Sequence, residues 1–430
     1  MRCPAQPAGH LFFILFKMRE NMKCKIAMAA ALALGLSATA QAAESVKEMF
    51  AQTYGKGEIR MLDFKRDFED NTDTRRDNAI GGLLYLHTGT LKGVSFGLTA
   101  AAANDMLSND DDTVYGLLQR GSDGDHESFT RLQEYYIQCD WFKTKIKYGA
   151  QELNTPFMNK HDIRMLPKTY KGLTIENKSM DNLTLSAYYI TDYMGWADEE
   201  FISASQSVKA TISDEKPVYV AGAQYNIPVS AVKSNVQAWH YNMTDVFNET
   251  YFKASVSKDF NGFAAYLTPA LLFQKSQGDE LAGELDTNQY GLNAGVKFKG
   301  FDLTGYYAKT GDNDLLVPWG DDKVIIQQVL ASGRAEEKAY AAKLNYDFGS
   351  LGVNGLSAYI YHAVYDAPDS GSHKAADMKE TDFSVQYAFS GALDGLGLRT
   401  RYAVINVDGG EDYDDLRFYV TYKFAFGAQK

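Results

Sequence analysis

Apolar and polar residues alternate with a period of two along most of the chain. The alternation is clear in Phe142–Tyr148, Leu183–Ile190 and Phe383–Phe389. Successive side chains of a β-strand point to opposite faces, so this pattern predicts half-buried strands. One face of each predicted strand is apolar and aromatic, and the other is polar or small.

Eighteen such segments follow one another, and no linker or low-complexity stretch separates them into domains. The predicted strands begin near Lys56, Asn78, Val94, Ser128, Trp141, Gly172, Asn182, Lys216, Ser234, Asn248, Gly262, Asp286, Gly300, Glu336, Asn354, Thr381, Leu396 and Asp415.

The connections between these strands alternate between short and long. Short ones cover 89–93, 139–141, 178–182, 258–262, 298–301 and 390–396, and long ones cover 105–127, 152–171, 194–215 and 311–335. A few intermediate links, such as 244–247, blur the rule. Short periplasmic turns and long extracellular loops are typical of an outer-membrane barrel, in which apolar faces meet lipid and polar faces line a lumen. We therefore predict an all-β protein, a transmembrane antiparallel β-barrel of about 18 strands, in preference to a soluble sandwich.

Composition agrees with this fold class. The chain has 13% aromatic residues, 36 glycines and only 9 prolines, which favours β-structure. After residue 43 no segment offers the roughly 20 consecutive apolar residues that a membrane-spanning helix needs.

The N-terminus has the features of a cleaved export signal. Met22–Lys25 is basic, Ile26–Leu36 is apolar, and Ala40–Ala42 is a small-x-small cleavage site. We expect a leader over 1–42 with its true start at Met18 or Met22 (an extended but still cleaved leader is the alternative), a periplasmic lead-in over 43–55, and the barrel over 56–430.

Export changes the charge and the cysteine count. Loss of the leader takes the net charge from −12 to −16, because five basic residues and one acidic residue are removed. An acidic exported protein is a poor nucleic-acid binder. Cys139 is the one cysteine left, so no disulfide framework is expected, and we interpret it as a small apolar residue rather than a nucleophile or ligand.

Basic residues recur on the polar face of several predicted strands. A lysine or arginine facing the hydrocarbon midplane costs about 2–4 kcal/mol, so these residues indicate a watery lumen. They attract anionic solutes in one interpretation and are solvated charges paired with carboxylates in the other. The set is Arg60, Arg66, Lys143, Lys145, Lys147, Arg399, Arg401 and Arg417.

The long connection around 154–172 breaks the alternation. It contains two prolines, several cations and several apolar residues, so we expect it to fold into the pore and narrow it. Phe157, Met158, Met165 and Leu166 are the residues expected to anchor it against the wall. His161 is either a titratable pore residue or an ordinary loop histidine.

Other chemistry is weakly supported. Acidic clusters occur at 109–112, 123–125, 312–314, 321–322 and 411–415. In one interpretation they keep the loops solvated, and in the other the loops bind Ca²⁺ or Mg²⁺. None of them matches a Ca²⁺-loop pattern with the required ligand spacing. The histidines are scattered and no catalytic motif accompanies them, so we expect no enzyme activity and no cofactor.

Several segments together resemble the OprD-type outer-membrane porins. They are Gly57–Phe68, Asp162–Gly172, Gly311–Gly320, Leu398–Tyr402 and Asp415–Tyr422. The resemblance implies an 18-stranded, substrate-selective channel for small, often carboxylate-bearing nutrients, with an eyelet formed by the third and seventh loops.

The resemblance also implies roles for individual residues. It puts Arg164 and Lys168 at the constriction facing the aperture, beside His161 and Asp162, and puts Arg399, Arg401 and Arg417 on a basic ladder. It implies a seventh-loop contribution from Asp312, Pro318 and Trp319. Two departures, Lys168 in place of a common glutamine and a long seventh loop over 311–335, leave the solute open.

Two alternatives remain. One is a general trimeric porin with cation preference and adhesive loops, and the other is a barrel enzyme or structural adhesin without an open pore. The expected location is the bacterial outer membrane. Expected partners are small solutes, outer-membrane lipid and lipopolysaccharide, and the barrel-assembly machinery, with the protein a monomer or a homotrimer.

Overall fold

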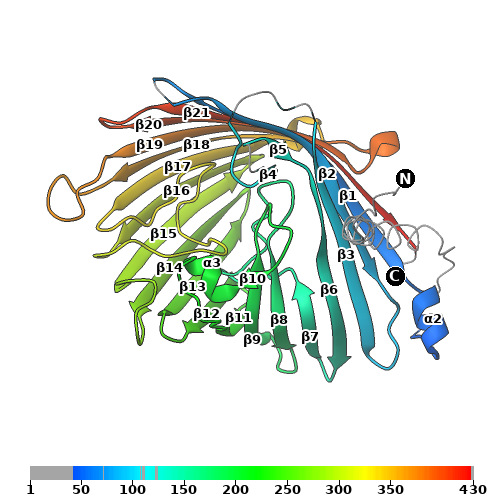
Figure 1. The fold of residues 1–430 in the computed structure, drawn as a ribbon. Coiled ribbons are helices and arrows are strands. Elements are labelled where there is room, and N and C mark those ends of the chain that lie inside the picture. Colours follow the sequence, from blue (N-terminus) through cyan, green and yellow to red (C-terminus); the bar gives the residue numbers. More distant parts are fainter. Residues whose placement is uncertain (1–41, 71, 107, 109–111, 122–123, 428–430) are drawn as a thin grey trace, which may run out of the picture.

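Long antiparallel strands form a closed barrel around an interior that several loops enter (Figure 1). The computed structural model describes residues 42–70, 72–106, 108, 112–121 and 124–427. The predicted leader therefore lies outside the described residues, except for Ala42.

The barrel has 18 strands, as predicted. They are β1 (Tyr54–Phe68), β2 (Arg75–His87), β3 (Val94–Asp105), β6 (Phe129–Trp141), β7 (Thr144–Gln151), β8 (Thr169–Asn177), β9 (Leu183–Met194), β11 (Val218–Ile227), β12 (Lys233–Met243), β13 (Phe247–Phe260), β14 (Phe263–Ser276), β15 (Thr287–Phe298), β16 (Phe301–Thr310), β17 (Lys338–Asp347), β18 (Leu356–Asp366), β19 (Met378–Ala388), β20 (Leu396–Val407) and β21 (Tyr413–Phe426).

Each strand pairs with its neighbours along the chain, and pairing of β1 with β21 closes the barrel. The register runs from Gly55 opposite Phe426 to Phe68 opposite Tyr413. Every predicted strand start lies within three residues of the observed one, as for Asn78 against Arg75. The barrel begins at Tyr54 rather than Lys56, so the predicted lead-in is two residues too long.

Seven short elements complete the fold of the described residues. They are α2 (Val46–Ala51), β4 (Gln119–Arg120), β5 (His126–Glu127), β10 (Ile202–Ser203), α3 (Ala204–Val208), η1 (Phe348–Leu351) and η2 (Gly391–Leu393). The sequence reasoning did not foresee α2, which Ser45 caps by accepting the Glu48 amide hydrogen. In the described part of the chain, no helix is long and apolar enough to cross a membrane.

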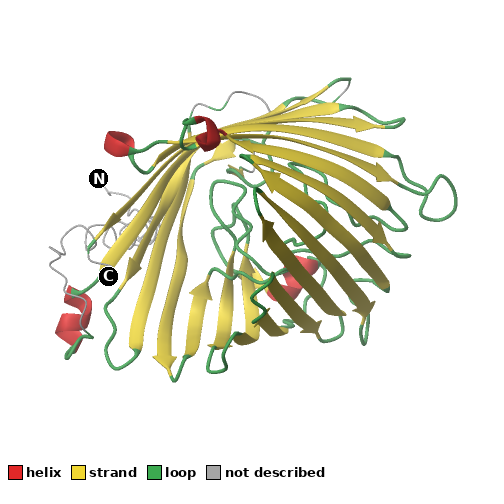
Figure 2. Ribbon diagram, turned by 180° about the vertical axis from the view of Figure 1, so that it is seen from behind, coloured by secondary structure: helices red, strands yellow, loops and turns green. Residues whose placement is uncertain are grey.

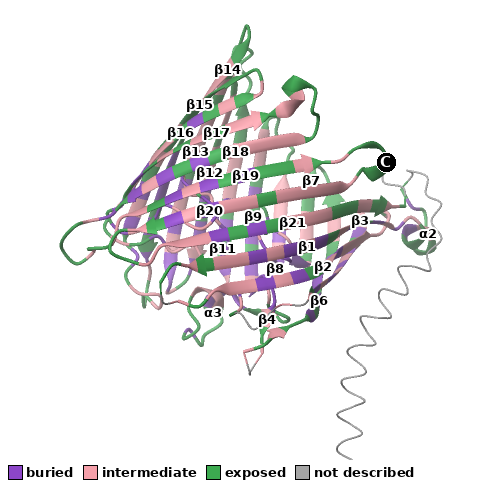
Figure 3. Ribbon diagram, turned by 90° about the horizontal axis from the view of Figure 1, so that it is seen from above, coloured by how far each residue is buried: buried purple, intermediate pink, exposed green. Residues whose placement is uncertain are grey.

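Side-chain exposure alternates along the barrel wall, as Figure 3 shows from above. In β14, Ala270 and Leu272 are 7% and 2% exposed, whereas Leu271 and Phe273 are 43% and 50% exposed. The exposed set is apolar and points outward, which fits a surface that contacts lipid.

Turns at one end of the barrel are tight, and loops at the other end are long. Residues 142–143 alone join β6 to β7, with Phe142 and Lys143 at φ 49° and 57°. Positive φ at both central residues is the geometry of a type I′ hairpin turn. Lys143 therefore belongs to the turn, which corrects its predicted place on the strand face beside Lys145 and Lys147.

The long loops fill part of the barrel interior (Figure 2). We name them the second loop (106–128), the third loop (152–168), the fourth loop (195–217) and the seventh loop (311–337). Fully buried residues of these loops, such as Met158, Leu166 and Ile325, pack against inward-facing wall residues.

Candidate functional site

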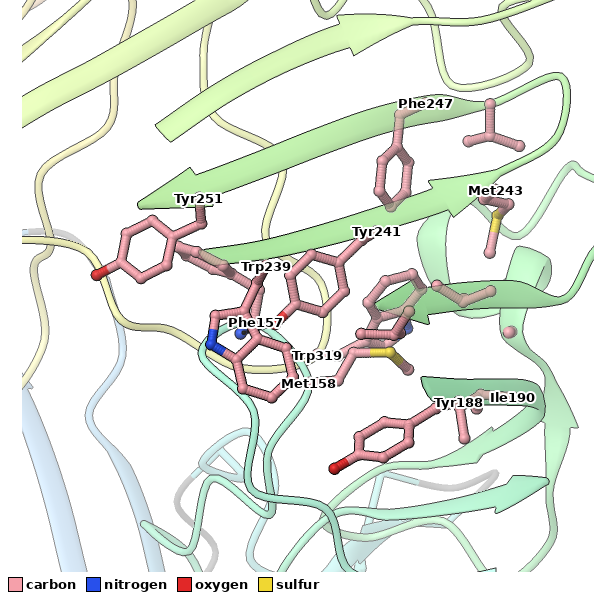
Figure 4. Close-up of a cluster of buried hydrophobic side chains, with 14 of the residues drawn as sticks. Phe157, Met158, Tyr188, Ile190, Trp239, Tyr241, Met243, Phe247, Tyr251 and Trp319 are labelled. Atoms are coloured by element: carbon pink, nitrogen blue, oxygen red, sulfur yellow. Dashed lines mark hydrogen bonds between the residues drawn. The ribbon is translucent and has the colours of Figure 1, made fainter. Parts of the chain in front are cut away.

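The first half of the third loop is anchored by apolar contacts. The Phe157 ring meets the rings of Tyr251 and Tyr241 edge-on, at centroid distances of 5.0 and 6.2 Å. Met158 is fully buried in the same cluster, which includes Trp319 of the seventh loop (Figure 4). Burial of each such side chain contributes about 1.5–3 kcal/mol, so these contacts hold the loop against the wall.

The second half of the loop packs against a different part of the wall. Met165 and Leu166 are fully buried in a cluster with Leu62 and Phe64 of β1 and Leu117 of the second loop. The four apolar residues expected to anchor the loop are thus all buried.

Arg60 fastens the loop to β1. Its guanidinium lies 2.8 Å from the Asp162 carboxylate and 2.6 Å from Glu58, and it also donates to the Arg164 carbonyl. With 8% of its side chain exposed, Arg60 is a clamp rather than a free lumen charge.

The structure corrects the expectation that the Arg164 side chain faces the aperture. Its Nε donates to the Tyr115 carbonyl at 2.9 Å, and its guanidinium lies over the rings of Phe64 and Trp196 at 5.1 and 5.0 Å. Only 8% of the residue is exposed, so Arg164 joins the second, third and fourth loops to one another.

Lys168 bridges the third and seventh loops. Its ammonium donates to the carbonyls of Trp319 and Pro318 at 3.0 and 3.3 Å, and lies 4.3 Å from the centre of the Trp196 ring. The residue is 5% exposed, and this burial lowers the pKa of Lys168 to about 8.

The third loop separates two cavities. The first, about 960 Å³, lies at the long-loop end and is lined by His161, Lys168, Trp196, Asp198 and Asp321 among others. The second, about 390 Å³, is lined by Asp162, Arg399, Arg401 and Lys423 among others. His161 and Asp162 are consecutive and line different cavities, so the loop is a partition between them.

His161 is a neutral group at this partition. Burial, with Lys168 nearby, lowers the pKa of His161 to about 4. Its ring packs against Trp196 at 5.2 Å, and the Trp196 Nε1 donates to its carbonyl at 2.7 Å.

The predicted basic ladder divides into two kinds of residue. Arg417 and Arg66 each lie 2.7 Å from Asp415, and Arg417 also donates to the Gln328 carbonyl of the seventh loop. Arg399 and Arg401 line the second cavity, and neither has a carboxylate within 4.0 Å among the described residues. The nearest partner of Arg399 is the Ser384 hydroxyl at 3.4 Å, and Arg401 Nε is buried without a partner.

The lysines of β7 lie on the inner wall but apart from this ladder. Lys147 lies 4.2 Å over the Tyr136 ring, and Lys145 is opposite Asp140 in the β6–β7 register. They are therefore brought near β6 rather than near Arg399 and Arg401.

The seventh-loop residues fall in three different places. Pro318 lines the first cavity. Trp319 is 2% exposed and donates to the Ser207 hydroxyl at 2.7 Å, so it anchors the loop instead of lining an eyelet. Asp312 is exposed and lines an outer cavity with Lys309 and Lys338, away from the partition.

Sequence reasoning missed three charged wall residues that hold the loops. Arg131 of β6 donates to the carbonyls of Pro167, Gly195 and Asp198. Glu380 of β19 accepts the amide hydrogens of Val329 and Leu330, and Asp382 accepts that of Gln328. Each is a charged residue at an inward-facing position of its strand, and this position is the sequence signal by which it could have been found.

Metal binding gains no geometric support from the described residues, which hold no group of three or more His, Cys, Asp or Glu side chains placed to bind an ion. Residues 109–111 and 123 of the acidic clusters lie outside the part that is described.

Comparison with known proteins points to one family. A family model described as "outer membrane porin, OprD family" matches residues 49–426. No curated protein sequence matches the chain significantly.

Solved structures from two bacterial genera share the fold. Vanillate-bound OpdK of Pseudomonas aeruginosa has 19% identity and a TM-score of 0.80, with 88% of this chain and 100% of that chain covered. OccK9 (OpdG) of the same species has 22% identity, the same coverage and a TM-score of 0.80. OccAB3 of Acinetobacter baumannii has 20% identity and a TM-score of 0.78, with 87% and 100% covered.

Proposed function

Because the chain belongs to the OprD family of outer-membrane porins, we propose that it selects small solutes that carry a carboxylate. The chain is an 18-stranded barrel of the bacterial outer membrane, and solutes cross such barrels by passive diffusion. The proposal concerns which solutes pass and which residues select them.

The observation that carries the proposal is the pair of guanidinium groups in the second cavity. Arg399 and Arg401 lie two residues apart on the inner face of β20 and form no salt bridge with a carboxylate of the described residues, although Arg401 interacts electrostatically with Asp382. A guanidinium offers a planar fork of donors that matches a carboxylate. A carboxylate that passes the third loop therefore meets two guanidinium groups that no salt bridge occupies.

The surrounding charges support a selective role for these two residues. Arg66 and Arg417 share Asp415, and Arg60 lies between Glu58 and Asp162, so these three arginines are largely neutralised. The attraction for anions on this wall then falls mainly to Arg399 and Arg401.

A bilayer experiment with the full chain tests the proposal. Purified protein in planar bilayers under a KCl gradient gives the ratio of anion to cation permeability from the reversal potential, and liposome swelling compares acetate, succinate and benzoate with sugars. The double variant Arg399→Gln/Arg401→Gln should lower that ratio and slow carboxylate entry, while sugar entry changes little.

Lys309→Gln is the matched control, because Lys309 lies on the outer rim and lines a different cavity. A wild-type protein that forms no channels would overturn the porin activity itself. Channels whose selectivity is the same in wild type and double variant would overturn only the carboxylate assignment.

A further inference from the structure

A further cavity, about 220 Å³, lies beneath the seventh loop against the barrel wall. Its lining includes Lys253, Asn293, Tyr306, Lys343 and Tyr361 from the strands, and Asp322 from the loop. Of these residues, the sequence reasoning named only Asp322, as part of an acidic cluster. Three lysines line the cavity, Lys253, Lys343 and the loop residue Lys323, and the difference between their partners indicates a binding site.

Two of the lysines are neutralised. Lys253 lies 2.8 Å from the Asp322 carboxylate, and Lys323 lies 3.4 Å from Asp321. These pairs tie the seventh loop to β13 and to itself, so their charges serve the position of the loop.

Lys343 has no such partner. No carboxylate of the described residues lies within 4.0 Å of its ammonium, which instead sits 4.2 Å over the Tyr359 ring and 5.3 Å over the Tyr361 ring. Stacking over two rings restricts a flexible side chain to one region of the cavity. The Asn293 amide, which lines the same cavity, also has no protein partner in the described part of the chain.

We propose that this cavity is a second anion subsite, in which Lys343 and Asn293 bind the carboxylate of a permeating solute. The inference rests on the proposed function and adds residues to it. Lys343 lies on β17, three strands from the arginines of β20, so the two sets of donors are distinct places on the wall. The cavity volume suits a small acid such as benzoate or succinate rather than an oligosaccharide.

Crystals of the full chain soaked in 4-bromobenzoate test the site directly, because bromine gives an anomalous signal. The expected result is a bromine peak in this cavity with the carboxylate near Lys343 Nζ, and loss of that peak in Lys343→Gln. Absence of the peak in wild type, or its persistence in the variant, would overturn the proposal.

Single-channel recording gives a second, functional readout. One charge about 4 Å from the anion is worth roughly a factor of five in affinity in a watery lumen, so the half-saturating acetate concentration should rise about fivefold in Lys343→Gln. Lys338→Gln is the control: it removes the same charge from the same strand, but Lys338 lines the outer cavity.

The outcomes separate the two proposals. If Lys343→Gln matches wild type while Arg399→Gln/Arg401→Gln loses selectivity, the second subsite is wrong and the proposed function stands. If the arginine variant also matches wild type, the proposed function fails. Heat-modifiable mobility on gels checks that each variant has folded as a barrel.

Discussion

Titration and substitution of Lys168 test most directly how the loops determine the electrostatic field in the pore. Its ammonium is the polar link between the third and seventh loops and lines the first cavity. Two charge-assisted hydrogen bonds and the Trp196 face favour the charged form, while burial opposes it. Burial is the larger effect, because it lowers the pKa of Lys168 from 10.5 to about 8.

The difference between the two pKa values gives the size and the sign of the effect of pH on folding. A difference of about 2.5 pKa units, at 1.36 kcal/mol each, corresponds to about 3 kcal/mol of preference for the neutral amine in the folded barrel. Between pH 8 and 10.5 the unfolded chain holds this proton and the folded barrel has lost it. Folding therefore becomes more favourable as pH rises through this window, and the lumen loses one positive charge near pH 8.

The assay is the reversal potential of single channels under a KCl gradient, measured from pH 6 to 9.5. Anion selectivity should fall in one step centred near pH 8, and Lys168→Gln should show the lower selectivity throughout without a step. Lys160→Gln is the matched control, because Lys160 lies in the same loop but is nearly half exposed. A flat wild-type profile, or a step that survives in Lys168→Gln, would refute the assignment.

Three further predictions concern the same wall and loops. Phe157→Ala should remove about 3–5 kcal/mol of anchoring and raise conductance and current noise, whereas the outward-facing Phe273→Ala should leave both unchanged in the same recordings. The selectivity lost in Arg399→Gln/Arg401→Gln should shrink between 0.1 M and 1 M KCl, because the screening length falls from about 10 Å to about 3 Å; an effect that stays constant with salt would point to altered shape instead. Lys143→Gln should not change ion selectivity, since Lys143 occupies a turn, and Lys147→Gln should lower anion permeability; equal effects of the two on reversal potential would contradict this placement.

The strands were predictable because their signal is local. A period of two in side-chain polarity is readable within about ten residues, and all 18 strands follow from it to within three residues. Lys143 shows where this signal ends. The alternation continues through Phe142 and Lys143, but the backbone reverses there, and only the positive φ of both residues reveals the turn.

The orientation of charged side chains was not predictable in the same way. Arg60 is neutralised by Asp162, 102 residues away, and Arg66 by Asp415, 349 residues away. The alternation of side chains along a strand shows that an arginine points inward. Its partner, however, depends on which loop crosses the lumen at the level of that arginine. The family resemblance put Arg164 and Trp319 at the aperture, and the structure buries both.

These partners imply a rule for reading the lumen charges of this chain. Inward cations bind loop carbonyls, as Arg60 and Arg131 of the wall and Lys168 of the third loop do, and inward carboxylates bind loop amides, as Glu380 and Asp382 do. An isolated inward charge is costly in such a setting unless it is paired or solvated, and these wall charges are paired with groups of the loops that they fix. Arg399, Arg401 and Lys343 line lumen cavities and form no salt bridge within the described residues, so their charges are available to a solute. Selectivity in this barrel should therefore depend on these three positions, and on other lumen cations without a salt bridge such as Lys147 and Lys168, more than on the total number of basic residues in the wall.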